Sequence, residues 1–204
     1  MLQGDDAPPY WLNTSHPRIR LVHHSDYFVD RTVLPTFSSD AIHVNIHRVP
    51  GLGDIMINWC DDFFLGAPVF PEDWIRDGKP VIYLESGYVR GGQTEYERTK
   101  ARKGNKWLGK VYHTKAVIER EFPDHAASGK RLNFVKHAPF PMSLKVLREM
   151  AERYQAEYNQ TYHNRFRTYD TVDVPTLHNM YCQVRHTVDL LISSVTELLL
   201  IAVG

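Results

Sequence analysis

The sequence predicts an α/β protein, and three observations support this prediction. Short apolar runs at residues 19–22, 55–60 and 80–84 have the length of buried strands. Residues that favour helix starts, and apolar side chains three and four positions apart, predict helices between and after these runs. The composition is globular, with 43% hydrophobic and 24% charged residues, and 204 residues are enough for one domain with a hydrophobic core.

The first half of the chain is expected to hold the three strands and one short helix. The run IRLV at residues 19–22 follows a turn containing proline and predicts the first strand. The segment from Ser38 to Gly51 opens with N-cap residue types and ends in Pro-Gly, which predicts a helix of about two turns. The run at residues 55–60 is followed by no turn residue until Gly66, and PVIYL at residues 80–84 predicts the third strand.

A basic segment, RGGQTEYERTKARKGNKWLGK at residues 90–110, separates the two halves. It holds seven basic residues, two acidic residues and four glycines, and it shows no apolar period. This composition predicts a mobile basic loop. The loop would be either a solvated linker or a lid over a phosphorylated ligand.

The second half of the chain is predicted to be mainly helical. Ser143 can cap a helix whose apolar residues follow the spacing of one packed face. A second helix is expected to start near Thr176, directly after Pro175, and to run toward the C-terminus. The residues expected on the packed face of the first helix are Leu147, Met150, Ala151, Tyr154 and Tyr158.

The two ends of the sequence predict neither a secretory signal nor a membrane span. The N-terminus, MLQGDDAPPYWL, lacks a basic region followed by an apolar one. The C-terminal VDLLISSVTELLLIAVG carries Asp189 and Glu197 and falls short of the ~20 apolar residues that a membrane-spanning helix needs. A buried amphipathic helix is expected there.

Charge, cysteine content and short motifs exclude several functional classes. Lys plus Arg and Asp plus Glu both number 24, so no overall field favours nucleic acid or an anionic membrane. Cys60 and Cys182 lie in no CxxC spacing, and Cys60 is expected to be a small core residue. The sequence contains no GxGxxG, GxxxxGK[ST], GxSxG or HExxH motif, which argues against dinucleotide binding, P-loop hydrolysis, nucleophile-elbow esterases and zinc peptidases.

The adjacent carboxylates Asp61 and Asp62 follow a predicted strand. Each raises the cost of ionising the other, and burial of either would be unfavourable without a partner. A divalent cation would resolve both problems, because carboxylate oxygens suit Mg²⁺ or Mn²⁺, with a substrate phosphate completing the shell. The alternative is that one aspartate caps the following turn while the other faces water.

Histidine and arginine residues supply further candidates. His43 and His47 lie four positions apart and would share one helix face, but they lack the third ligand of a zinc site, so ordinary structural histidines are expected. His137 lies in KHAPFP, where two prolines stiffen the chain. Arg165 and Arg167 would point the same way from an extended segment and suit a phosphate or carboxylate, with surface ion pairs as the alternative.

Two long blocks of the sequence closely resemble the Stealth family of phosphotransferases. The runs WLNTSHPRIRLVHHSDYF, LPTFSSDAIHVNIHRVPGL and FFLGAPVFPEDW, with the acidic pair between the last two, resemble its second block. The segment from KHAPFPMSLKVLREM to YHNRFRTYD resembles its third block. Together the blocks cover about residues 10–90 and 134–175. The family includes the alpha/beta subunit of N-acetylglucosamine-1-phosphotransferase and bacterial capsular-polysaccharide phosphotransferases.

The resemblance implies a fold and a reaction. The fold would be part of a Rossmann-like, nucleotide-sugar-transferase-like sheet with flanking helices, without its N-terminal strand or strands. The enzyme would transfer a sugar 1-phosphate, for example from UDP-N-acetylglucosamine, to a hydroxyl of a glycan or glycoprotein and release UMP. No nucleic acid partner is implied. The compartment would be the secretory pathway for a eukaryotic member and the cytoplasm for a bacterial one.

The resemblance also assigns roles to four residues of this chain. Asp61 and Asp62 match the family's acidic pair and would bind Mg²⁺ or Mn²⁺ and the diphosphate, with Asp62 in the catalytic group. His137 matches the third-block histidine and would act as general base on the acceptor hydroxyl. Arg167 matches the third-block arginine and would bind and stabilise the transferring phosphate.

The departures from the family pattern predict an incomplete catalytic domain. Cys60 stands where the family usually has Asn, and His43 stands where it usually has Glu. The family's first and fourth blocks are not recognisable. The expected division is the second block at residues 1–90, a basic loop or insert at residues 91–133, and the third block with C-terminal helices at residues 134–204.

Three interpretations of the sequence therefore remain open. The chain is an enzyme of sugar-phosphate transfer, an inactive fragment that binds a glycan or a partner, or a truncated form of a larger enzyme. Under the last interpretation, the isolated chain has weak or no activity and a longer version is active.

Overall fold

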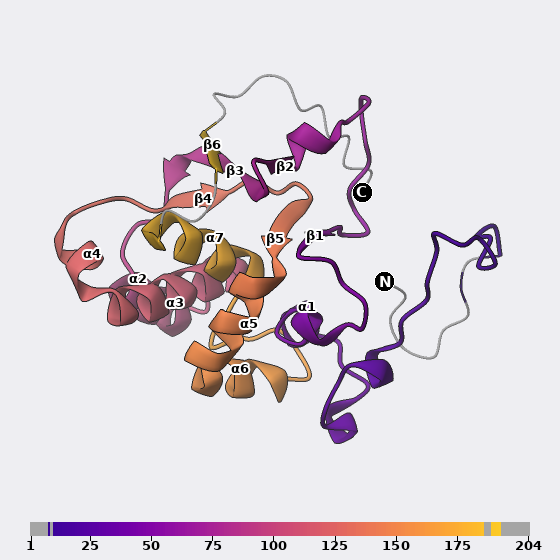
Figure 1. Ribbon diagram of the computed structural model, residues 1–204. Helices are drawn as coiled ribbons and strands as arrows, with labels where there is room; N and C mark the ends of the chain where they lie inside the picture. The colour runs from indigo at the N-terminus through magenta and orange to yellow at the C-terminus, as the bar shows by residue number, and fades with distance from the viewer. Residues whose placement is uncertain (1–7, 9, 186–188, 193–204) are drawn as a thin grey trace.

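The protein folds as a mixed α/β structure in which helices cover one face of a small sheet (Figure 1). The computed structural model describes residues 8, 10–185 and 189–192. The α/β class predicted from the sequence is confirmed. The helices are α1 Ser39–His43, α2 Gln93–Ala101, α3 Lys106–Glu121, α4 Pro123–Ala127, α5 Leu144–Arg153, α6 Gln155–Tyr162 and α7 Val174–Arg185, with short 3₁₀ turns at His24–Asp26, Arg31–Val33, Ile46–Arg48 and Pro71–Asp73.

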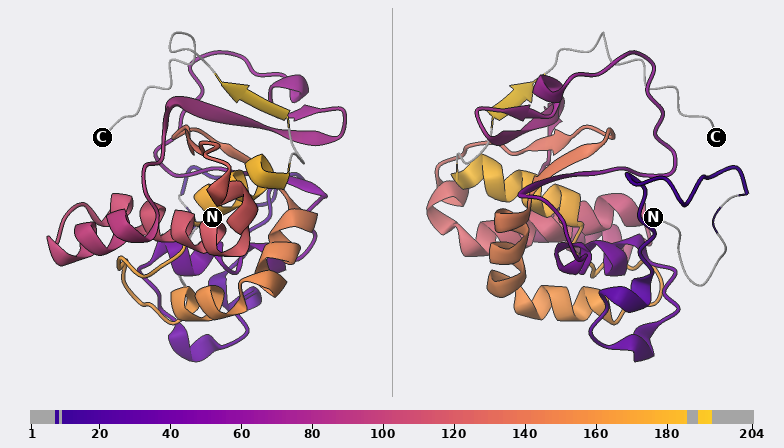
Figure 2. Two further views of the ribbon diagram at one scale, coloured as in Figure 1. Left: turned by 90° about the vertical axis from the view of Figure 1, so that its left-hand side faces the viewer. Right: turned by 45° about the vertical axis from the view of Figure 1, so that its right-hand side comes forward.

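The strands form two sheets. In the larger sheet, β3 (Lys79–Tyr88) pairs antiparallel with β2 (Ile75–Arg76) and β4 (Asn133–Val135), and parallel with β6 (Asp189–Ile192). Figure 2 shows from two sides that the helices lie on one side of this sheet. In the smaller sheet, β1 (Ile55–Asn58) pairs antiparallel with β5 (Phe140–Ser143).

Helix α7 is the centre of the hydrophobic core. Its ten residues from Val174 to Gln183 are all buried, because the helix lies between the sheet and helices α3 and α5. The helix expected after Pro175 is therefore confirmed. The fully buried large side chains around it include Val111 and Ile118 of α3, Leu147 and Met150 of α5, and Leu177, Met180 and Tyr181 of α7 itself.

Three of the predicted elements in the first half agree with the structure and one does not. Helix α1 and the 3₁₀ turn Ile46–Arg48 occupy the expected helical segment, β1 covers the first four residues of the second predicted strand, and β3 includes the third. The predicted strand at residues 19–22 is wrong. These residues are irregular and partly exposed, with Leu21 at 36% exposure, and they pair with no strand among the described residues.

The basic segment at residues 90–110 is not a loop. It forms α2 and the first turns of α3, and the two helices pack on each other. Asn105 accepts a hydrogen bond from the Leu108 backbone N–H at 3.1 Å and so caps α3. Gly109 lies within α3, where glycine is required because a Cβ would be only 2.4 Å from the ring of Tyr169. The glycines of the basic segment therefore mark helix boundaries and a close contact. Sequence composition alone does not distinguish this arrangement from a flexible loop.

The predicted helix after Ser143 is divided into two. The Ser143 side chain accepts a hydrogen bond from the Val146 backbone N–H at 3.4 Å, so the expected cap is confirmed. Tyr154 leaves helical geometry and separates α5 from α6. Its ring and that of Tyr158 nevertheless remain buried on the expected packed face.

The predicted C-terminal amphipathic helix is wrong for the part that the structure describes. Residues Asp189–Ile192 form strand β6, and the rest of that prediction, at residues 193–204, lies outside the described residues. In the described ranges, no helix is both long and apolar enough to cross a bilayer.

Candidate active site

The antiparallel pairing of β1 with β5 brings the acidic pair to His137. Asn58 at the end of β1 lies opposite Phe140 at the start of β5, and extending this register places Asp61 level with His137. His137 Nε2 lies 3.6 Å from Asp62 Oδ2. The antiparallel ladder thus brings together two residues that are 75 positions apart in the sequence.

The turn that carries the acidic pair is fixed from within. The Phe63 backbone N–H donates to the Cys60 carbonyl oxygen at 3.2 Å, which closes a tight turn around the two aspartates. The Phe63 ring is buried and packs edge-on against the His137 imidazole, with ring centroids 4.8 Å apart. The same ring packs against Phe140. Phe63 therefore orients both members of the acid–histidine pair: its backbone N–H closes the turn that carries the aspartates, and its ring packs against the histidine.

The acid–histidine pair is open to solvent. The side chains of His137 and Asp62 are 71% and 47% exposed. Solvent screens their interaction in the free protein, so the contact contributes little to stability. An exposed imidazole beside a carboxylate is accessible to a large substrate such as a glycan.

Arg167 lies in the loop between α6 and α7. Its positive charge acts on the Cys60 thiol, which also lies in the field of Asp61 and Asp62. Burial, the largest cause, and the nearby acidic residues together raise the pKa of that thiol to about 11, while Arg167 opposes them. Cys60 is thus a neutral, half-buried thiol that follows strand β1, so the expectation of a core residue within a buried strand is wrong. Arg165 differs from Arg167, because its guanidinium points to the Leu34 carbonyl oxygen at 3.5 Å.

The two aspartates offer a donor set that fits a hard divalent cation. Adjacent carboxylates that face solvent are suitable first ligands for Mg²⁺, which commonly takes one or two carboxylates and completes its shell with water and substrate phosphates. No group of three or more His, Cys, Asp or Glu side chains within the described residues could hold a metal ion by itself. Cation binding here stays a prediction that requires the substrate's phosphates.

A buried ion cluster that the sequence did not predict joins helices α1 and α3 to the residue that precedes α7. Lys110 Nζ on α3 lies 2.6 Å from Asp40 Oδ1 on α1 and 2.8 Å from Asp173 Oδ2 before α7. Burial alone would lower the pKa of Lys110, but the two carboxylates outweigh this effect and raise it. Burial alone would raise the pKa of Asp173, but Lys110 and hydrogen bonds from Thr176 lower it to about 2. Lys110 and Asp173 are therefore both charged at neutral pH.

This cluster anchors the loop that carries Arg167. Thr171 Oγ1 donates to Asp40 Oδ2 at 3.0 Å, and the Asp173 backbone N–H donates to Thr114 Oγ1 at 3.0 Å. Both contacts attach the end of the loop to the helical layer. A signal for Lys110 was present in the sequence, because Asn105 and the apolar residues after it have the pattern of a capped helix. A pairing between Asp40, Lys110 and Asp173 has no such local signal.

His43 and His47 do not share one helix face. Helix α1 ends at His43, and His47 belongs to the following 3₁₀ turn. His43 Nε2 lies 3.3 Å from the Asn58 amide nitrogen, while the His47 ring packs near Tyr158. Burial lowers the pKa of both, to about 4 for His47. They are structural histidines, as expected.

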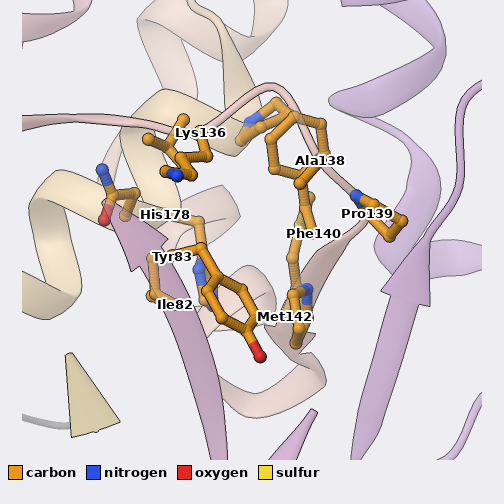
Figure 3. A pocket seen from close by; sticks show the side chains of 12 residues that line it. Ile82, Tyr83, Lys136, Ala138, Pro139, Phe140, Met142 and His178 are labelled. Atoms are coloured by element: carbon orange, nitrogen blue, oxygen red, sulfur yellow. The ribbon is translucent and has the colours of Figure 1, made fainter. Parts of the chain in front are cut away.

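A pocket lies between β3 and β5 beside the segment that carries His137 (Figure 3). Ile82 and Tyr83 form one wall, and Phe140 and Met142 form the opposite wall. His178 of α7 also lines it, and its Nε2 accepts a hydrogen bond from the Ser143 backbone N–H at 3.1 Å. Burial lowers the pKa of His178 to about 4. This neutral histidine holds the start of α5 in place and belongs to the core.

We expect the buried histidines to make the fold sensitive to acid. His178 has a pKa of about 4 in the folded state and about 6.5 when unfolded, so the unfolded state binds more protons between these values. Stability is therefore lost as the pH falls from about 6.5 toward 4, by about 2 kcal/mol for this residue at pH 4.5. His24, His43, His47 and His113 also have lowered pKa values and add to the effect.

Urea unfolding at pH 7.5, 6.0 and 4.5 measures this loss of stability. His178→Gln keeps an acceptor for the Ser143 N–H but does not titrate, so its unfolding free energy should depend less steeply on pH. An unchanged pH dependence in this variant would contradict the role of His178.

The fold and the site define an α/β protein in which an acidic pair lies beside an exposed histidine. Comparison of sequences identifies the family. Residues 2–82 match the model of Stealth protein conserved region 2, and residues 136–183 match that of conserved region 3. The chain belongs to the Stealth family.

Named relatives of the chain are polysaccharide phosphotransferases. The capsular polysaccharide phosphotransferase SacB of Neisseria meningitidis serogroup A is 32% identical over 170 residues, which are 82% of this chain and 29% of SacB. An exopolysaccharide phosphotransferase of Streptomyces coelicolor is 31% identical over 179 residues, which are 86% of this chain and 28% of that protein. The chain thus spans less than a third of the length of these relatives.

Proposed function

We propose that this chain provides catalytic residues for the transfer of a sugar 1-phosphate from a nucleotide sugar to a hydroxyl of a glycan. The observation that carries the proposal is the 3.6 Å approach of His137 Nε2 to Asp62 Oδ2, next to a second carboxylate. Its family membership and its named relatives support phosphotransfer as the reaction class. We propose UDP-N-acetylglucosamine as the donor.

The proposed step is an in-line displacement at phosphorus. His137 accepts the proton of the acceptor hydroxyl while the hydroxyl oxygen attacks the phosphorus that bears the sugar. The bond from this phosphorus to the bridging oxygen breaks, and UMP leaves with that oxygen. Asp62 stabilises the imidazolium that forms, in the same way that an aspartate supports histidine in other general bases.

Arg167 and the acidic pair are assigned to the phosphates of the donor. The guanidinium of Arg167 can pair with two oxygens of the transferring phosphate and stabilise the charge that develops there. A divalent cation on Asp61 and Asp62 would neutralise the diphosphate when it is bound. The solvent exposure of His137 leaves room for an acceptor as large as a polysaccharide.

Incubation with UDP-N-acetylglucosamine, Mg²⁺ and a mannoside tests the proposal. We expect UMP release that depends on both sugars, in the 204-residue chain or in a longer natural form that contains it. Asp61→Asn and Asp62→Asn should each reduce this release, while Asp77→Asn, at an exposed turn between β2 and β3, should not. Saccharide binding without UMP release in any form would favour the alternative of a glycan-binding module.

A further inference from the structure

Two tryptophans, Trp59 and Trp74, form an aromatic surface, the tryptophan platform, near the acidic turn. Trp59 lies two residues before Asp61, and its ring centroid is 6.3 Å from that of Trp74, with 55° between the ring planes. Trp59 is 41% exposed and Trp74 is partly exposed. Large exposed aromatic side chains are costly to leave in water and are common in binding sites.

The orientation of Trp59 is fixed by the same turn that holds His137. Its indole Nε1–H donates to the Phe63 carbonyl oxygen at 2.9 Å. The Phe63 ring in turn packs against the His137 imidazole. The indole of Trp59 and the imidazole of His137 therefore both contact Phe63, which links the position of the tryptophan pair to that of the candidate active site.

We propose that Trp59 and Trp74 bind a pyranose ring of the acceptor glycan. This inference rests on the proposed function. In that function the acceptor hydroxyl must reach His137, so the sugar ring that bears it lies next to this residue. A pyranose presents polarised C–H groups on its faces and hydroxyl groups around its edge. The C–H groups suit the electron-rich face of an indole, and the hydroxyls can donate to Asp61 or Asp62.

The surroundings of the tryptophan pair favour a neutral sugar over a charged ligand. Asp61 and Asp62 lie beside Trp59 and would repel an anionic ring substituent. The donor's phosphates are assigned instead to Arg167 and to the divalent cation that the acidic pair would hold. The two substrates therefore separate by charge, with the acceptor ring on the tryptophans and the diphosphate between the acidic pair and the arginine.

Binding is measured without turnover by following the indole N–H signals in a proton–nitrogen NMR spectrum. The chain has four tryptophans, so single substitutions assign the signals. Titration with methyl α-D-mannopyranoside should shift the signals of Trp59 and Trp74. It should leave that of Trp107 in place, since this residue is 50% exposed on α3 and stacks on Phe134.

Variants then test the contribution of the platform. Trp59→Leu and Trp74→Leu should each weaken mannoside binding, and raise the acceptor KM, by about 3- to 10-fold. Trp59→Phe keeps an aromatic face and should lose less. Trp107→Leu is the matched control and should change neither quantity. The affinity for UDP-N-acetylglucosamine and the urea midpoint should stay the same in every variant.

The outcomes separate this inference from the proposed function. Mannoside binding to the tryptophans without UMP release by any form would support the platform and contradict the transferase. UMP release with an unchanged acceptor KM in both leucine variants would support the transferase and overturn the platform. The platform is also overturned if the mannoside shifts the Trp107 signal as much as that of Trp59.

Discussion

Replacing His137 with glutamine is expected to slow UMP release by about 10²- to 10⁴-fold, the usual contribution of a general base. Glutamine has a similar reach and can still hydrogen-bond the acceptor, but it cannot take up a proton. Because His137 is 71% exposed, its removal leaves the core unchanged, so the urea midpoint should stay close to that of the unmodified protein. The rate is measured at saturating donor and acceptor in a form of the protein that releases UMP.

The protein contains a matched control for this substitution. His163 Nε2 lies 3.9 Å from Asp30 Oδ2, and both side chains are about as exposed as those of His137 and Asp62. This second acid–histidine pair belongs to the end of α6 and the N-terminal segment, away from the acidic turn. His163→Gln should therefore leave the rate unchanged. A rate that falls equally in both variants, or a decrease of less than tenfold for His137→Gln, would remove His137 from the proposed role.

Replacing Lys110 with methionine is expected to destabilise the fold by about 3–5 kcal/mol. The substitution keeps the length and apolar stem of the side chain but removes the charge that neutralises Asp40 and Asp173. Asp40 is fully buried and the side chain of Asp173 is 12% exposed, so neither carboxylate can recover its hydration without opening the contact between α1, α3 and α7. Urea unfolding at pH 7.5 measures the loss.

Lys100 provides the control for Lys110. Its Nζ lies 2.6 Å from Asp170 Oδ1, as close as Lys110 lies to Asp40, but its side chain is 48% exposed. Lys100→Met should cost less than about 1 kcal/mol, because water already screens that pair. Similar losses in the two variants would contradict the importance of burial. A destabilisation below about 1 kcal/mol for Lys110→Met would show that the cluster does not hold the helical layer together.

The sequence predicted those elements whose signals are local. Ser143 at the start of α5, the buried face of Leu147 and Met150, and the helix after Pro175 each follow from residues within a few positions of one another. The prediction of a loop at residues 90–110 was wrong because the basic, glycine-containing composition of the segment resembles a linker, although Asn105 is a helix-capping residue. The strand prediction at residues 19–22 was wrong because such a short run, with three apolar residues, forms a strand only where a neighbouring strand is available for pairing.

The residues of the candidate site were predictable from the resemblance of the sequence to the Stealth family. The geometry of the site was not predictable. Nothing near Asp62 in the sequence indicates His137, since their approach depends on the register between β1 and β5. Asp40, Lys110 and Asp173 could not be identified as a group for the same reason. Each is an ordinary charged residue in its own segment, and only helix packing brings the three charges together in a dry environment.

By itself, the sequence determined the α/β class, the helices after Ser38, Ser143 and Pro175, the absence of a dominant charge and, through the family resemblance, the residues proposed for phosphate chemistry. These properties follow from composition, short-range periodicity and family motifs. The tertiary structure decided that the acidic turn meets His137 and that Lys110 joins two carboxylates in the core. It also decided that Trp59 and Trp74 share a surface beside the site. Such contacts join segments that are distant in the chain, and their free energy comes from burial and strand pairing, which no local pattern records.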